Sequence, residues 1–243
     1  MPLGMDVSEL ALARGMRDTR GALSRWNENP FPVLRGWMLG ALAFAGGLLL
    51  AVLVVASLAP PDLTPAFIPG LAFPAELDDY GHVLFRNGIV LALHAVACVA
   101  GFIAGSSLPY QAQQMTGVKR WIHQKARPVA FAWVVGVTCF SLATQAYVLG
   151  STGSQLANQF GISPVLLVLT VLPHALVELT AIFLPLAAWT IASRRGDWQD
   201  LLAATVATVA VALPMLIVAA SWETWVWPHL LDMASPLVNS ALV

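Results

Sequence analysis

The run WMLGALAFAGGLLLAVLVVASLA at residues 37–59 decides the fold of this chain. It holds 23 consecutive residues without a charged side chain. A helix of about 20 apolar residues crosses the hydrocarbon core of a bilayer, which is about 30 Å thick. The apolar core of a cleavable signal peptide is shorter, about 7–15 residues. We therefore expect this run to be a retained membrane-spanning helix.

The composition of the whole chain points the same way. Of its 243 residues, 58% are hydrophobic and 10% are charged, whereas a soluble domain has about 25% charged residues. Because so few charges cannot cover a water-facing surface, lipid must solvate most of the chain. The formal net charge of −1 argues against binding to nucleic acid. The two cysteines, Cys98 and Cys139, lie in apolar runs without a metal-binding spacing.

Five segments are long and apolar enough to span a membrane, and they cover residues 34–59, 87–109, 128–150, 164–192 and 200–222. The sequence therefore predicts an all-α, polytopic transmembrane helix bundle with about five spanning helices in residues 34–222. Residues 1–33 precede it as an arm, and residues 223–243 follow it as a short tail. Three prolines of the fourth segment could bend or break its helix, namely Pro164, Pro173 and Pro185.

The basic residues indicate the orientation in the membrane. Eleven of the twelve fall in the N-terminal segment and in the connections after the second and fourth segments: Arg14, Arg17, Arg20, Arg25, Arg35, Lys119, Arg120, Lys125, Arg127, Arg194 and Arg195. Such a one-sided excess marks the cytoplasmic side. We expect a multi-pass protein of the cell inner (plasma) membrane, with its N-terminus in the cytoplasm and its C-terminus outside.

Two segments outside the predicted spans have a recognisable character. Residues 5–26 form a candidate helix, with Asp6 or Ser8 as its cap. This helix is either interfacial, with its arginines toward anionic lipid, or a solvated arm. The connection 60–86 contains five prolines and ends in a short acidic run, so most of it cannot be a regular helix. We expect an outer loop, which is either a plain connection or a surface for a partner.

Three ionisable side chains lie inside the predicted spans, namely His94, His174 and Glu178. A charged group at the centre of a spanning helix costs about 2.5–3.5 kcal/mol on insertion scales, so it usually faces the protein interior. His174 and Glu178 are four residues apart and share one helix face. They could form a polar lock between helices, a proton or ion relay, or a metal site with His94. The metal site lacks the two histidines of an H-E-x-x-H motif.

Other residues favour packing rather than chemistry. Small residues four apart let helices approach closely, and two such G-x-x-x-G spacings contain Gly36, Gly40, Gly101 and Gly105. Asn87 can cap the second span, and Glu223 lies at the outer end of the fifth. The sequence has no Gly-rich phosphate loop and no Ser-His-Asp arrangement. We therefore expect no enzymatic activity, no bound metal and no cofactor.

Three short stretches and the order of five spans together resemble a known family. The stretches are PHALVELTA at 173–181, FRNG at 85–88 and ASWETW at 220–225. The 173–181 stretch is similar to the proline-histidine-glycine-x-x-glutamate-leucine-x-alanine signature of the stage II sporulation protein M family, with Ala175 in place of the glycine. The 85–88 stretch resembles the start of the second span in that family, which begins with a pair of asparagines. Here the pair is reduced to Asn87 alone. The 220–225 stretch is similar to its alanine-x-x-glutamate pattern.

The resemblance implies that His174, Glu178, Asn87 and Glu223 are the residues to test. In the sporulation members of the family, the membrane protein organises a complex with cell-wall hydrolases and has no attributed catalytic activity. We therefore expect a non-enzymatic scaffold or accessory subunit of a membrane or envelope complex. The alternatives are a transporter or channel subunit with His94, His174 and Glu178 along a polar path, and an intramembrane metalloenzyme.

The expected partners follow from this interpretation. They are membrane lipid and other membrane or envelope proteins, and no nucleic acid. The sequence leaves open whether copies of the chain form a homo-oligomer.

Overall fold

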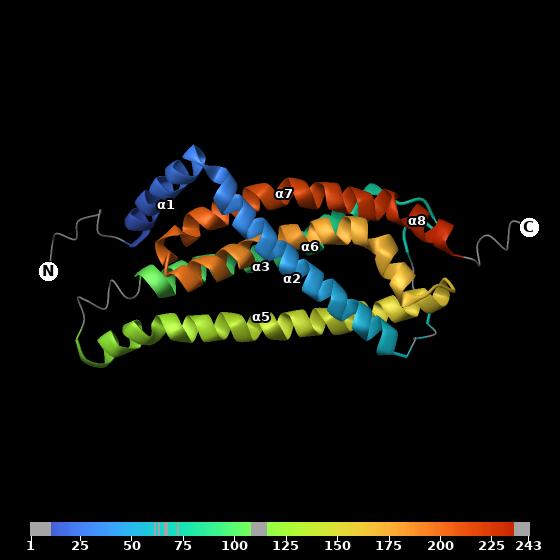
Figure 1. Ribbon diagram of the computed structural model, residues 1–243, viewed down its shortest axis with the longest axis horizontal. Helices are drawn as coiled ribbons and strands as arrows, with labels where there is room; N and C mark the ends of the chain where they lie inside the picture. Colours follow the sequence, from blue (N-terminus) through green and yellow to red (C-terminus); the bar gives the residue numbers. More distant parts are fainter. Residues whose placement is uncertain are drawn as a thin grey trace, which may run out of the picture. The chain divides into compact units, whose positions relative to one another are not determined.

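The computed structural model describes residues 11–107 and 116–235, apart from Pro61, Leu63, Ala66, Phe67 and Ala72. In these residues the regular structure is helical, and five helices are long and apolar enough to cross a membrane. They are built on α2 (Pro30–Leu58), α3 (Leu77–Phe102), α5 (Gly117–Gln159), α6 (Pro164–Arg195) and α7 (Leu201–Trp225) (Figure 1). The predicted all-α fold with five spanning helices is confirmed, and the chain is an integral membrane protein.

Shorter helices connect or follow the spans. They are α1 (Ala11–Glu28), the π-helix η2 (Ile103–Ser107), the 3₁₀-helix η3 (Trp198–Asp200) and α8 (Trp227–Ala234). The chain forms two compact units. The first unit takes residues up to Ala41 together with 91–137 and 183–211, and the second unit takes 42–90, 138–182 and residues from Ala212 onward. Each of the five long helices contributes residues to both units.

Helix α3 begins at Leu77 instead of residue 87, so the last part of the predicted outer loop 60–86 is helical. The acidic run, predicted as the end of the loop, is the first turn of the helix. Asp78 and Asp79 stabilise that turn because negative charge is favourable at a helix N-terminus. The Asp79 carboxylate also accepts a hydrogen bond of 2.9 Å from the backbone N–H of Glu76.

The described part of the proline-rich loop before α3 is not helical, as its prolines predict. Within it, the exposed Asp62 carboxylate accepts hydrogen bonds from the backbone N–H of Thr64 (2.9 Å) and from the Thr64 hydroxyl (2.8 Å). These bonds stabilise the ionised form, so the pKa of Asp62 is lowered, mainly by the backbone bond. A local turn therefore orders this part of the loop.

The turn between α5 and α6 shows why the fourth span starts at Pro164. Gly161 has a φ of +63°, which glycine adopts without strain. The N–H of Ile162 donates to the carbonyl of Ala157 (2.9 Å), a bond typical of a helix that ends on such a glycine. The Ser163 hydroxyl then accepts from the N–H of Leu166 (3.2 Å) and caps α6.

Helix α6 is continuous from Pro164 to Arg195, so its prolines do not break it. Figure 1 shows that the golden first half of α6 changes direction. Proline is a common cause of such bends, and Pro173 lies in this half. Of the two predicted effects of these prolines, the helix is bent and is not broken.

The predicted tail from residue 223 contains ordered structure as far as the structure describes it. Helix α7 runs on to Trp225, and α8 follows. In the second unit, the fully buried Leu231 of α8 packs against Ile68 of the loop and against Ala157 and Leu167. The Ser235 hydroxyl donates to the carbonyl of Phe160 (2.9 Å). These contacts join α8, the outer loop and the α5–α6 turn into one apolar cluster.

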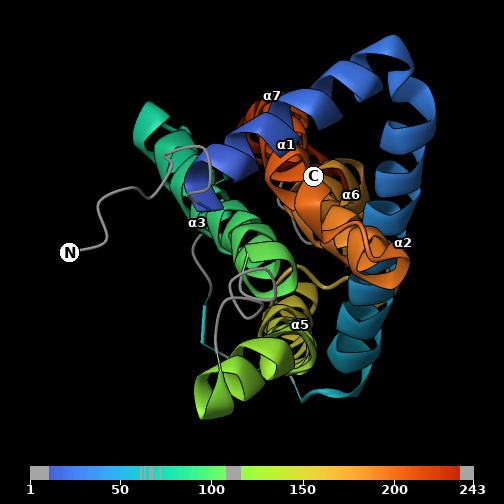
Figure 2. The same cartoon turned by 90° about the vertical axis from the view of Figure 1, so that its left-hand side faces the viewer.

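In the first unit, α1 lies against the ends of α3 and α7 (Figure 2). A Cβ on Gly15 would lie 2.9 Å from the Phe102 ring and 3.0 Å from Leu202. Arg25 forms an ion pair of 3.0 Å with Asp200 of η3. The candidate helix 5–26 is therefore real from Ala11 onward, while its expected caps, Asp6 and Ser8, lie outside the described residues.

The glycines of the two G-x-x-x-G spacings differ in how closely they are packed in the first unit. A Cβ on Gly40 would lie 3.1 Å from the Cβ of Ala187, and one on Gly36 would lie 3.9 Å from the nearest atom, on Ile191. A Cβ on Gly101 would lie 2.7 Å from the indole nitrogen of Trp189. A Cβ on Gly105 would overlap the indole ring of Trp198. Gly101 and Gly105 therefore leave space for two large aromatic rings.

Candidate functional site

Three helices of the second unit bring Asn87, Glu178 and Glu223 together. Asn87 lies on α3, Glu178 on α6 and Glu223 on α7. The Glu178 carboxyl is hydrogen-bonded to the Glu223 carboxyl and interacts with the Asn87 side chain. The amide nitrogen of Asn87 is buried, and it has no hydrogen bond of normal geometry. Residues that are separate features in the sequence thus form one polar cluster.

A basic side chain that the sequence analysis did not select as a site residue, Arg86, lies beside this cluster. Arg86 precedes Asn87 on α3, and its guanidinium attracts both carboxyl groups. Its side chain is exposed, so water screens part of this attraction. Its position in the sequence could have indicated this role, because Arg86 is the one basic residue of the 60–86 connection and directly precedes Asn87.

His174 lies one helical turn from Glu178 on α6. Its side chain is 5% exposed, and its Nδ1 has no hydrogen-bond partner. The imidazole lies against the indole ring of Trp227, with 5.8 Å between the ring centres. The Trp227 indole N–H donates to the Thr170 hydroxyl (3.2 Å), which fixes the position of that ring. His174 is therefore held by packing while one of its nitrogens stays unpaired.

A cavity of about 210 Å³ joins His174 to the two carboxyl groups. His174, Glu178, Glu223 and Thr152 supply the polar part of its wall. The rest is largely leucine and valine from α2, α5 and α6, including Leu49, Val52, Leu149, Leu167 and Val171. The cavity is therefore apolar along most of its length and acidic at one place.

A second cavity, of about 390 Å³, lies next to the first in the same unit. Its wall contains Asp79, His82 and Arg86 from the first turns of α3, and Ile68 and Pro69 from the outer loop. Thr152, Leu156, Glu223 and Trp227 line both cavities. Glu223 thus faces a charged cavity beside the loop and also the cavity that contains Glu178.

His94 belongs to the first unit and has its own surroundings there. Its ring meets Phe183 edge-on, with 5.5 Å between the ring centres. Nearby in the same unit, the buried Cys98 thiol donates to the carbonyl of Pro185 (3.1 Å). Within the described residues, no group of three or more His, Cys, Asp and Glu side chains is arranged to hold a metal ion.

The hydrogen bond between Glu178 and Glu223 can be tested by a double-mutant cycle. Glu178→Gln keeps a polar partner for Glu223 and is expected to cost less than about 1 kcal/mol. Glu178→Leu leaves the Glu223 carboxyl half-buried without that partner and is expected to cost about 2 kcal/mol more. The double variant Glu178→Leu/Glu223→Leu should lose less than the sum of the two single losses, because no unpaired carboxyl remains.

The measurement is thermal unfolding in detergent, followed by circular dichroism. Strict additivity of the two leucine variants would show that the two carboxyl groups do not interact.

The comparisons with known proteins agree with this arrangement. The fold and the cluster define a polytopic membrane protein whose spanning helices share an acidic pair. The model of the SpoIIM family, described as Stage II sporulation protein M, matches residues 41–228, a range that contains Asn87, His174, Glu178 and Glu223. The chain belongs to this family, and the resemblance seen in its short motifs is confirmed. Searches of curated proteins and of solved structures found no match.

Proposed function

We propose that this protein is a non-enzymatic scaffold or accessory subunit of a membrane or envelope complex. The observation that supports this most is the exposure of α5. In its spanning part, Phe131–Gln159, 6% of the most apolar 18 residues are buried, against 22% to 44% in the other four spans. A spanning helix with so few contacts to its own chain presents most of its surface to lipid or to another transmembrane helix.

Small residues on α5 favour contact with another transmembrane helix rather than with lipid. Ala132 and Gly136 are four residues apart and both are exposed, a spacing that lets another helix approach closely. No atom lies within 4 Å of a Cβ built on Gly136. Large exposed side chains surround this small pair, among them Phe131, Trp133 and Phe140. The combination resembles an interface between transmembrane helices. Family membership supports the same role, since the sporulation members organise a complex.

Co-purification tests the scaffold role. We expect gentle detergent extraction, followed by mass spectrometry, to find the protein together with other membrane or envelope proteins. Gly136→Leu should reduce this association at least tenfold, because the added side chain keeps the partner helix away. Gly46→Leu on α2 is the matched control, since a Cβ on Gly46 also meets nothing within 4 Å. A protein that is monomeric and alone in every extract would contradict the proposal, and self-association would identify a homo-oligomer.

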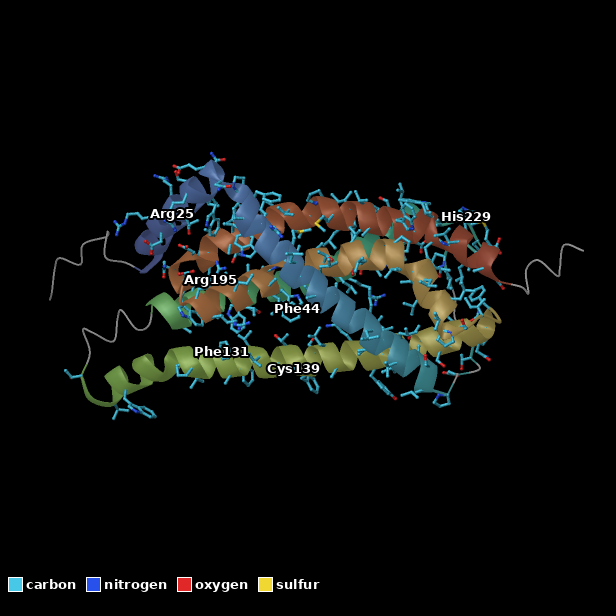
Figure 3. All side chains as sticks on the ribbon, in the orientation of Figure 1. Arg25, Phe44, Phe131, Cys139, Arg195 and His229 are labelled. Carbon is cyan, nitrogen blue, oxygen red and sulfur yellow. The ribbon has the colours of Figure 1, made fainter. Side chains whose placement is uncertain are left out.

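The proposal includes an orientation in the inner (plasma) membrane, with the N-terminus in the cytoplasm. The first unit contains eleven of the twelve basic residues, including Arg25 and Arg195 (Figure 3). The second unit contains Arg86 alone. An excess of this kind is typical of the cytoplasmic side. After five spans, the C-terminus then lies outside.

Cysteine labelling of intact cells tests this orientation. In a Cys139→Ala background, a membrane-impermeant thiol reagent should modify Glu76→Cys in intact cells. It should modify Glu28→Cys only after the membrane has been permeabilised. Both positions are exposed, and the other native cysteine, Cys98, is buried. The reverse labelling pattern would overturn the orientation.

A second candidate function, a transporter or channel subunit, is favoured by the two adjoining cavities. His174 and Glu178 line the first of them, whereas His94, the third residue of the predicted path, lines neither cavity. Purified protein in liposomes should then carry an ion or small solute across the membrane. Glu178→Gln should reduce that flux at least tenfold without changing the amount of folded protein. Liposomes with no flux above the protein-free control would leave the scaffold role as the better proposal.

A further inference from the structure

The cavity at Glu178 combines an acidic pair with an apolar wall. We propose that it binds an aliphatic ammonium compound, whose nitrogen lies between Glu178, Glu223 and His174 and whose hydrocarbon part lies along the leucines and valines. This site is separate from the exposed Ala132–Gly136 surface of α5. The ligand site and the partner surface can therefore be tested, and can fail, independently of each other.

The acidic pair can hold an ammonium group in place of a proton. Glu178 and Glu223 are hydrogen-bonded to each other, so they share one proton and together carry one negative charge, which Arg86 attracts. Two ionised carboxylates at that separation would repel strongly. An ammonium group that enters between them can take over the role of the shared proton, which then leaves to solvent, and its N–H groups donate to both carboxylates while the local charge stays balanced.

His174 is an independent observation that points to a ligand. Its side chain is 5% exposed, its Nδ1 has no partner, and it lines the same cavity as the two carboxyl groups. A buried polar atom without a hydrogen bond is costly, and a neutral imidazole offers one acceptor nitrogen. Glu178, Glu223 and His174 thus supply three acceptors. A primary ammonium group has three N–H donors to match them.

The apolar wall indicates what kind of cation fits. Leu49, Val52 and Leu149 cannot coordinate a hydrated metal ion, and no described group of three ligands is arranged to hold one. A hydrocarbon chain gains from contact with such a wall, because burying each CH₂ group that leaves water improves affinity about fourfold. The cavity of about 210 Å³ limits the ligand to a small aliphatic amine or to the amine end of a larger molecule.

The second cavity adjoins this site. It lies beside the outer loop and shares Glu223 with the first cavity. Its wall carries Asp79 on the first turn of α3, and acidic groups at a cleft raise the local concentration of cations. Glu223 therefore has a cation-attracting carboxyl, that of Asp79, in the wall of the adjoining cavity, together with the Arg86 guanidinium.

Binding of short alkylammonium ions to the purified full chain tests the proposal. The probes are ethyl-, butyl- and hexylammonium chloride, with n-alcohols of the same length and sodium chloride as references, measured by calorimetry and thermal shift. Ammonium ions should bind, with an affinity that rises about fourfold per CH₂ group until the chain outgrows the cavity. Alcohols of equal length should bind at least tenfold more weakly. Equal binding of alcohols and amines, or stabilisation by sodium alone, would overturn the proposal.

Variants then locate the site. Glu178→Gln and Glu223→Gln should each weaken amine binding at least tenfold, whereas Glu76→Gln, an exposed carboxyl outside the cavity, should leave it unchanged. Ala175→Leu fills part of the cavity and keeps the charges, so it should shorten the longest chain that binds. The difference in affinity between amines and alcohols is measured on the wild-type protein. The proposal therefore stays testable even if one of the variants does not fold. Unchanged binding in all three cavity variants would refute the site.

Nanodiscs separate a free amine from a lipid headgroup with the same chemistry. In phosphatidylcholine nanodiscs, butylammonium should bind as it does in detergent. If phosphatidylethanolamine lowers its apparent affinity at least tenfold, the natural ligand is a lipid ammonium group. Unchanged affinity assigns the site to a free amine. Absence of butylammonium binding in both kinds of nanodisc would contradict the proposal.

Discussion

Gly105→Ala is expected to destabilise the protein by about 3 kcal/mol, although it adds a single methyl group. The new Cβ would overlap the indole ring of Trp198. Trp198 is 5% exposed, so it cannot move aside without disturbing its neighbours in the first unit. Overpacking of a buried site typically costs about 1–3 kcal/mol, and the overlap here is severe. The measurement is the melting temperature in detergent, followed by circular dichroism.

A matched glycine provides the control for this prediction. Gly46 lies in α2, and a Cβ at this position meets nothing within 4 Å. Gly46→Ala should be neutral or stabilising by up to about 1 kcal/mol, because alanine is the better helix former. The double variant Gly105→Ala/Trp198→Leu should recover part of the loss, since the smaller side chain removes the overlap. Equal melting temperatures for Gly105→Ala and the wild type would show that the two helices are not packed at this glycine.

Phe183→Ala is expected to cost about 2–4 kcal/mol. Phe183 is fully buried in the first unit, where its ring meets His94 edge-on at 5.5 Å. Truncating a buried phenylalanine in a water-soluble protein costs about 3–5 kcal/mol. The loss in a membrane is somewhat smaller, because lipid already surrounds the side chain in the unfolded reference state. The remaining cost comes from the cavity and from the lost ring contact.

Phe140 is the matched control for Phe183. It lies on α5 and is 75% exposed, so Phe140→Ala should cost less than about 0.5 kcal/mol. Both variants remove the same atoms, so their difference measures burial alone. Unfolding in increasing denaturant in mixed micelles provides the free energies. Similar losses for the two variants would mean that Phe183 faces lipid or that Phe140 is covered by another chain.

Much of the fold could be predicted from the sequence because hydrophobic length alone identifies a spanning helix. The same criterion locates helix ends poorly. Helix α3 starts at Leu77 and α5 starts at Gly117, since polar first turns continue a helix beyond the apolar core that hydropathy detects. Asp78 and Asp79 fall in the predicted loop, although negative charge near a helix start is a known N-terminal signal.

The candidate site could be predicted only in part. The spacing of His174 and Glu178 places them on one helix face, and the family motif selects Asn87 and Glu223 as well. Their meeting depends on how α3, α6 and α7 pack, which no local pattern specifies. The same limit applies to the glycines. A G-x-x-x-G spacing predicts close approach, but it does not say that indole rings occupy the space beside Gly101 and Gly105.

The cluster around Leu231 means that the second unit can complete its packing only after the last helix, α8, has been synthesised. Residues 227–235 are synthesised after all five spans, yet they cover Ile68 and Leu167 and place Trp227 beside His174. The second unit therefore cannot finish packing during translation of its own helices. Until α8 has been synthesised, Leu167 at the start of α6 and Ala157 at the end of α5 lack the cover of Leu231. A chain that ends before Trp227 therefore leaves Ile68 and Leu167 without the apolar side chains that cover them in the complete second unit.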